Sequence, residues 1–170
     1  MRVIGVTSDP GDLSAFYRRT CPGLVGLLAS IGGSRDEAEE VAHDAYVSLL
    51  PRWGQIREYN DPEAWLRTVA VRALVSRQRR ARVRTLGLVR LAHEPFPHAR
   101  PPNPDSVAVA EALQNLPVGH RAVIVLHHGL DLSVEDVAAE LQVPVGTVKS
   151  RLARGRAAMR LLLAEEESRA

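Results

Sequence analysis

A proline-rich stretch near the middle of the chain divides the sequence into two parts. His93–Asp105 reads HEPFPHARPPNPD and holds five prolines. Proline lacks a backbone N–H donor and fixes φ, so this density disfavours a helix and favours an extended chain. We therefore predict a linker at 85–106 between two modules, at 13–84 and 107–166, with residues 1–12 as an N-terminal tail. Each module is near the lower size limit for an independent core.

Helical periodicity predicts that both modules are all-α. In the first, Ser34 and Glu37 form an S-x-x-E capping box that begins a helix ending near Leu50. Apolar residues recur in it at three- and four-residue spacing and predict its buried stripe. Pro62 fits the first position of the next helix, with Asn60 or Asp61 as its cap. The predicted helices are Leu13–Ala29, Ser34–Leu50 and Pro62–Arg82, and the stripe is Ala38, Val41, Ala42, Ala45 and Leu49.

The second module has the pattern of a helix-turn-helix. Ser133 and Asp136 form a capping box for a short helix, the turn QVP follows, and a longer basic helix begins at Pro144. Two helices are predicted in front of this motif. The full set of predicted helices is Ser106–Leu116, Pro117–His128, Ser133–Leu141 and Pro144–Glu166.

Composition and charge argue against a disulfide-stapled, secreted or membrane-spanning protein. The formal net charge of +2 conceals a block of eight arginines without an acid from Ala64 to His93 and an acidic block from Asp36 to Asp44. Blocks of opposite sign indicate several distinct charged surfaces. The single Cys21 cannot form an internal disulfide. With no signal-like or membrane-spanning run, we expect a cytoplasmic protein without membrane insertion.

The last helix separates into two faces when its residues are projected at 100° per residue. An apolar arc is expected to face the core. Thr147, Ser150, Arg151 and Arg154 form a polar arc opposite Leu163, and Lys149 flanks the apolar arc. A merely solvated helix would mix acids among its bases, and here no acid occurs before Glu165. The pattern favours contact with a phosphate backbone over a solvated surface. The apolar arc is Val148, Leu152, Gly155, Met159, Leu162 and Leu163.

The arginine-rich helix of the first module has a similar division. Its predicted core stripe is Leu66, Val69, Ala70 and Ala73. An adjacent polar stripe has an aromatic residue at its N-terminal end, which suits contact with unstacked bases and phosphates. The alternative for the aromatic residue is packing into the core. The polar stripe consists of Trp65, Thr68, Arg72, Ser76 and Arg79.

The acidic helix has two open interpretations. Glu39, Glu40, His43, Asp44 and Val47 lie on its predicted outer side. Such a face is commonly just solvated. An acidic face with exposed Val47 and Tyr46 nearby would equally suit a basic protein partner.

Signals for catalysis or metal binding are weak. The chain has no glycine-rich phosphate loop. His127 and His128 are adjacent and diverge on a helix, so they do not form the i,i+4 pair that ligates a metal. Cys21 has no assigned base and fits a small apolar role. We expect no catalytic residue, no metal and no cofactor.

Three segments together resemble a bacterial RNA polymerase sigma factor of the extracytoplasmic-function (ECF) type. They are SRDEAEEVAHDAYVSLLPRW, DPEAWLRTVAVRALVSRQRR and LPVGHRAVIVLHHGLDLSVEDVAAELQVPVGTVKSRLARGRAAMR. In order, they resemble the helix that binds core polymerase, the helix that reads the −10 element, and region 4 with its −35-reading helix-turn-helix. The resemblance covers about 13–82 and 107–163.

The resemblance implies a non-catalytic, dissociable polymerase subunit. It places Glu40, His43, Asp44 and Val47 against the clamp helices of the largest polymerase subunit, and region 4 at the polymerase flap. Asn60, Asp61 and the stripe from Trp65 to Arg79 would hold the −10 element. Thr147, Lys149, Ser150, Arg151 and Arg154 would bind the −35 duplex. An anti-sigma protein is a further implied partner.

Some positions depart from the family pattern. The family usually has Gln where His43 stands, Gly where Gln142 stands, and Asn and Asp at the positions of Arg72 and Ser76. Two other functions remain open at this level. One is a DNA-binding regulator whose first module senses a ligand or protein, and the other is an RNA-binding protein that uses both arginine-rich helices.

Overall fold

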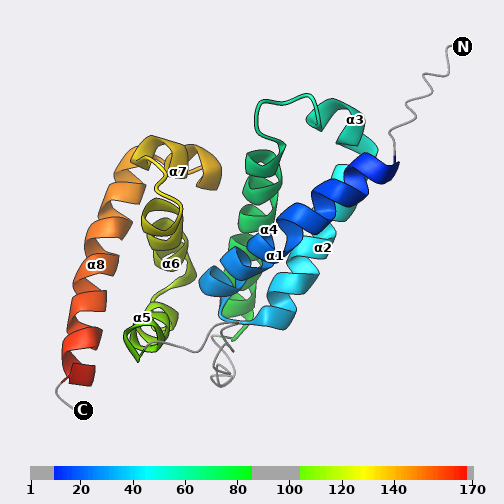
Figure 1. The fold of residues 1–170 in the computed structure, drawn as a ribbon. Helices are drawn as coiled ribbons and strands as arrows, with labels where there is room; N and C mark the ends of the chain where they lie inside the picture. Colours follow the sequence, from blue (N-terminus) through cyan, green and yellow to red (C-terminus); the bar gives the residue numbers. More distant parts are fainter. Residues whose placement is uncertain (1–9, 86–103, 168–170) are drawn as a thin grey trace, which may run out of the picture.

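The computed structural model describes residues 10–85 and 104–167, which form helices and no strand. Figure 1 shows two groups of helices side by side, α1–α4 and α5–α8. The all-α fold is therefore confirmed. The predicted tail falls almost wholly, and the predicted linker mostly, outside the described residues.

The first group consists of four α-helices and one short 3₁₀ turn. Helices α1 and α2 pack on each other, and α4 packs against both. The short elements between α2 and α4 were not predicted from the sequence. The bounds are α1 Pro10–Gly32, α2 Arg35–Leu49, η1 Leu50–Arg52, α3 Trp53–Ile56 and α4 Pro62–Thr85.

Local capping signals set where these helices begin. The Ser34 side chain accepts a hydrogen bond from the backbone N–H of Glu37 at 3.3 Å, as the capping box predicts. Asp61 Oδ1 accepts from the N–H of Ala64 at 2.9 Å, so Asp61 is the cap of α4 and Pro62 its first residue. The predicted stripe of α2 is confirmed, since all five residues are buried.

The predicted core stripe of α4 is only partly correct. Leu66 and Ala70 are buried as expected, but Ala73 is exposed, and Val71 and Leu74 are fully buried instead. The physical reason is that α4 contacts α1 and α2 on one side and α6 and α7 on another. Its buried surface is therefore broader than, and rotated from, a single stripe.

The second group contains the helix-turn-helix, formed by α7 and α8. Ser133 caps α7 by accepting from the N–H of Asp136 at 3.0 Å. The helix predicted at Pro117–His128 is α6 followed by a π-helical turn, η2. Val123, Leu126, Val137 and Val148 are fully buried in this group. The bounds are α5 Pro104–Gln114, α6 Val118–Ile124, η2 Val125–Gly129, α7 Val134–Leu141 and α8 Val145–Glu167.

The turn between α7 and α8 has a left-handed residue at its centre. Gln142 has φ 52° and ψ 49°, the conformation that usually selects glycine at the end of a helix. Val143 N–H then bonds to the carbonyl of Ala138 at 3.0 Å. This turn sets the angle at which α8 leaves α7.

Candidate nucleic-acid and polymerase interfaces

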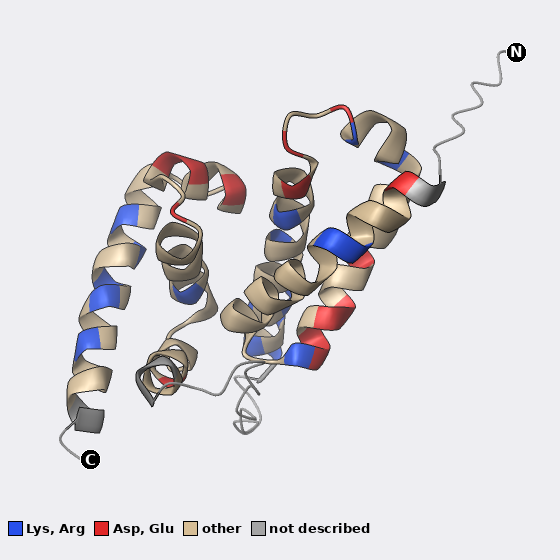
Figure 2. Cartoon of the chain, viewed as in Figure 1, with Lys and Arg blue, Asp and Glu red and all other residues tan. Residues whose placement is uncertain are grey.

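The exposed basic face of α8 is the most distinct candidate interface. Figure 2 shows Lys and Arg distributed along this helix. Val148 and Leu152 point into the core, whereas Lys149, Ser150 and Arg154 are exposed. The opposed faces match the predicted arcs. A helix held in this way by α7 can present a row of hydrogen-bond donors to a phosphate backbone.

Arg151 and Thr147 are only partly exposed within this face. A Cβ built on Gly119 would lie 3.3 Å from the Arg151 guanidinium, so that side chain rests against the first turn of α6. Burial, and next the charge of Arg79, lower the pKa of Arg151. Burial, and then Arg151 and Arg154, also lower the pKa of His120. Arg79, Arg151 and Arg154 thus concentrate positive charge here, which favours an anionic ligand.

The predicted −10 residues lie along α4 and the loop before it. Asn60, Asp61, Ser76 and Arg79 are exposed. Thr68 and Arg72 are half-buried. The loop before α4 and the C-terminal end of the stripe are therefore at the surface, whereas the middle of the stripe is partly covered.

Trp65 is partly buried and packs against the hydrophobic core. The structure thus supports the alternative in which Trp65 packs into the core.

The predicted polymerase-binding residues gather on the outer side of α2. Glu40, His43, Asp44 and Val47 are all exposed, and 49% of Val47 is accessible. Acidic residues follow this face in Figure 2. Tyr46 is different, because it is buried and its hydroxyl lies 2.6 Å from that of Thr20. The expectation of an exposed Tyr46 beside Val47 is therefore wrong. Burial also raises the pKa of Tyr46 to about 12.

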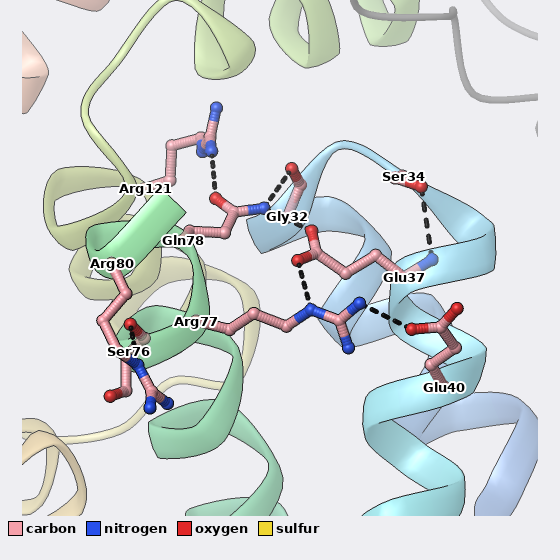
Figure 3. A network of polar contacts seen from close by, with 9 residues as sticks. All are labelled: Gly32, Ser34, Glu37, Glu40, Ser76, Arg77, Gln78, Arg80 and Arg121. Atoms are coloured by element: carbon pink, nitrogen blue, oxygen red, sulfur yellow. Dashed lines mark hydrogen bonds and ion pairs between the residues drawn. The ribbon is translucent and has the colours of Figure 1, made fainter. Parts of the chain in front are cut away.

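A network of polar contacts ties this acidic face to α4 and to the second group of helices (Figure 3). Arg77 lies 2.6 Å from Glu40 and 3.3 Å from Glu37. Gln78 donates to Glu37 at 2.7 Å and accepts from Arg121 of α6 at 3.0 Å. Gln78 and Arg121 were not predicted from the sequence, because their pairing joins residues 43 positions apart and leaves no local signal.

The two adjacent histidines have hydrogen-bond partners of their own. His127 Nδ1 lies 2.7 Å from the carbonyl of Leu132, and His128 Nε2 accepts from Arg156 at 3.1 Å. In the described ranges 10–85 and 104–167, no cluster of three or more His, Cys, Asp or Glu could hold a metal ion. Nor is any helix of these ranges long and apolar enough to cross a bilayer.

The geometry defines a two-part, all-helical protein with a helix-turn-helix and a second arginine-rich helix. Comparison with protein families agrees with both parts. Residues 16–84 match the family described as Sigma-70 region 2, and residues 106–159 match Sigma-70, region 4.

Individual relatives extend this agreement over nearly the whole chain. The ECF RNA polymerase sigma factor SigM of Mycobacterium tuberculosis is 32% identical over 156 residues, which cover 90% of this chain and 79% of SigM. SigL of the same organism is 32% identical over 174 residues, covering 96% of each chain. Among solved structures, the sigma factor RpoE in complex with the anti-sigma factor NepR from Bartonella quintana has a TM-score of 0.72. It is 25% identical, and the match covers 90% of this chain and 97% of RpoE.

The chain therefore belongs to the ECF family of RNA polymerase sigma factors. Its function is that of a promoter-recognising sigma factor.

Proposed function

We propose that this sigma factor works in the cytoplasm as a non-catalytic subunit that binds core polymerase through α2 and promoter DNA through α4 and α8. The module at 13–84 binds core polymerase and the −10 element. The module at 107–166 binds the −35 element, and 85–106 links the two modules. The observation that carries this assignment is the separation of charge by element, with exposed acids along α2 and exposed basic residues along α4 and α8.

The α2 surface is proposed to dock on the clamp helices of the largest polymerase subunit. Glu40 and Asp44 supply negative charge. His43 and Val47 are exposed on the same side of α2 and complete the patch. Acidic side chains around an exposed apolar residue are suited to a basic helical partner, because complementary charge steers the encounter and fixes its register.

The α4 surface is proposed to hold the opened −10 element. Asn60 and Asp61 lie at its N-terminal end, followed by Trp65, Thr68, Arg72, Ser76 and Arg79. Removing a base from the stack costs a few kcal/mol, so binding to polymerase must supply part of the free energy. Asp61 also caps α4, which couples the shape of the loop to the helix that follows it.

The α8 surface is proposed to read the −35 duplex in the major groove. Thr147, Ser150, Arg151 and Arg154 face the base edges and backbone, with Lys149 at the flank. Only a few phosphate contacts are available to this face, so the isolated contact is weak and sensitive to salt. Strong promoter binding then needs both modules on one polymerase.

An anti-sigma protein is proposed as the regulatory partner. The support is the likeness to RpoE, whose solved structure is a complex with the anti-sigma factor NepR.

Run-off transcription with purified core polymerase tests the proposal. We expect a promoter-specific transcript that needs both this protein and core enzyme, and co-elution of the two on gel filtration. Tight binding to duplex DNA alone, without co-elution or transcript, would contradict the polymerase assignment.

A further inference from the structure

Arg72 of α4 caps the C-terminus of α7, a helix of the other module. Its Nε donates to the carbonyl of Glu140 at 2.5 Å, and its Nη2 donates to the carbonyl of Ala139 at 2.7 Å. The last carbonyls of a helix lack partners within the helix and carry the negative end of its dipole. A guanidinium is well suited to them. The residue in the middle of the proposed −10 surface is therefore already occupied.

Arg67 binds the side chain of the same Glu140. Its Nε lies 3.0 Å from Oε1 and 3.2 Å from Oε2, and its Nη2 lies 3.1 Å from Oε2. Side-chain exposure is 19% for Arg67 and 5% for Glu140, so the pair is largely shielded from solvent. A forked, shielded pair of this kind fixes geometry as well as contributing energy. Together, Arg67 and Arg72 hold the end of α7 at a carboxylate and two carbonyls.

This arrangement chemically resembles the binding of a nucleic-acid backbone. A carboxylate beside the negative end of a helix offers several oxygen acceptors to guanidinium groups, as phosphates do. Glu140 is a buried acid on a helix whose other acids, Glu135 and Asp136, are exposed. Its burial is explained by the pairing of its carboxylate with Arg67 of α4.

A polar contact between the modules carries a desolvation cost. Arg121 is 4% exposed, donates to Gln114 and to Gln78, and has a buried Nε without a hydrogen-bond partner. Burial lowers the pKa of this guanidinium. A buried charge bonded only to neutral groups contributes less than a charge pair and bears the cost of desolvation. Polar contacts of this kind are typical of domain interfaces that open.

A groove beside these contacts adds repulsion between the modules. Its volume is about 1100 Å³, and no Asp or Glu is among its lining residues. Arg79 of α4 and Arg151 of α8 both line it, and the charge of Arg79 contributes to the lowered pKa of Arg151. The proposed −10 and −35 surfaces thus face a common groove in the closed arrangement.

We propose that the C-terminus of α7 is an internal ligand of α4. This ligand holds the free protein closed and competes with single-stranded −10 DNA for Arg72. This inference rests on the proposed role of α4 in binding the −10 element. Opening breaks the Arg67–Glu140 pair and the two Arg72 bonds, and it exposes Arg72 and Arg151 together. Promoter DNA bound to both modules then favours the open form by mass action.

Glu140→Gln tests the proposal in the full-length chain without polymerase. The variant keeps the shape of the side chain and removes its charge. Spin labels at Asp36→Cys and Ala157→Cys, both exposed positions, report the separation of the modules in a Cys21→Ala background. Anisotropy of a labelled single-stranded 20-mer of mixed sequence reports access to α4. We expect longer distances and an affinity at least about fivefold higher, since the apparent affinity scales with the fraction of open protein.

Glu135→Gln is the matched control, because it removes an equal charge from the exposed side of α7. It should change neither readout. If folded Glu140→Gln keeps the wild-type distances, or opens without a gain in affinity for the 20-mer, the internal-ligand proposal is wrong. Should Glu140→Gln lose its helical circular dichroism, Arg67→Gln gives the same distance test from the other partner, and unchanged distances would again overturn it.

The same variants separate this inference from the proposed function. Run-off transcription with core polymerase reports the proposed function, and the distance measurement does not depend on it. If Glu140→Gln opens the protein but the wild-type protein never supports a transcript, the closing role of the α7 C-terminus stands and the proposed sigma function of the surfaces is wrong.

Discussion

Arg77 of α4 and Glu40 of α2 form an ion pair with 2.6 Å between Nη2 and Oε2. Hydrogen bonding to Glu40 is the first cause of the raised pKa of Arg77, and Glu37 adds to it. Glu40 is also a proposed polymerase contact. In the free protein, this carboxylate is therefore held toward α4, and docking on a basic polymerase helix must compete with Arg77.

Glu40→Ala is expected to weaken binding to core polymerase about tenfold, the effect of losing a central interface residue. Its effect on folding should be small, because exposed ion pairs contribute at most about 1 kcal/mol. Glu39→Ala is the matched control, since Glu39 is exposed on the same helix and pairs with Arg35 at 2.7 Å. Binding is measured by titrating fluorescent protein with core enzyme. Equal loss of affinity in both variants would show that α2 acts through net charge and that Glu40 has no specific contact.

Arg151→Ala is expected to reduce −35-dependent initiation and leave core binding intact. Loss of a base-reading contact costs about 1–3 kcal/mol, whereas loss of a phosphate contact weakens binding to all sequences and lowers the salt slope of DNA binding by about 1. Run-off transcription at several salt concentrations gives the comparison. Arg160→Ala, an exposed arginine farther along α8, is the control and should retain activity. A loss of core binding in Arg151→Ala would mean that α8 has been assigned the wrong role.

Features that depend on near neighbours in the sequence were predicted well. The caps at Ser34, Asp61 and Ser133 each depend on a residue three positions away, and all are present. The buried stripe of α2 was also correct, because this helix buries a single side. Local hydrogen bonding and burial of a single side of a helix are both visible in a periodic pattern.

Features that depend on contacts between the two modules were not predictable. The buried side of α4 was misplaced at Ala73, because the helix packs against both modules. Arg67 and Glu140 are 73 positions apart, and no periodicity in either helix marks their pairing. Arg72 was predicted to be a nucleic-acid contact from its place in a polar stripe, yet that stripe contains no signal of the α7 carbonyls that it binds. Contacts between modules follow from tertiary structure alone.

Gln142→Gly is expected to stabilise the helix-turn-helix. Gln142 is left-handed at φ 52°, a conformation that costs a residue with a Cβ about 1–2 kcal/mol. Glycine removes this strain but gives the unfolded chain more freedom, which offsets part of the gain. We expect a net increase of roughly 1 kcal/mol in the free energy of unfolding, measured by urea denaturation. Gln142→Ala keeps a Cβ and should give no such gain. Equal effects of glycine and alanine would show that the left-handed turn is not strained.

His120 is expected to couple the stability of the second module to pH. Burial, and then the charges of Arg151 and Arg154, lower the pKa of His120 below its ordinary value. The native protein therefore favours the neutral ring. As pH falls through about 6.5, the unfolded chain gains this proton before the native chain does, so stability is lost until the native pKa is reached. His120→Gln removes this proton. Its free energy of unfolding should fall less steeply than that of wild type between about pH 7 and about pH 5.5.

DNA binding gives this prediction a second readout. Phosphates placed beside Arg151 and Arg154 offset the positive charge near His120 and raise its pKa. The pH-dependent difference between wild type and His120→Gln should therefore shrink when saturating duplex DNA is added. Thermal unfolding across this pH range, with and without duplex, measures both effects. Parallel pH profiles for the two proteins without DNA would show that His120 does not titrate differently in the native state. A difference that duplex leaves unchanged would place the bound phosphates away from Arg151 and Arg154.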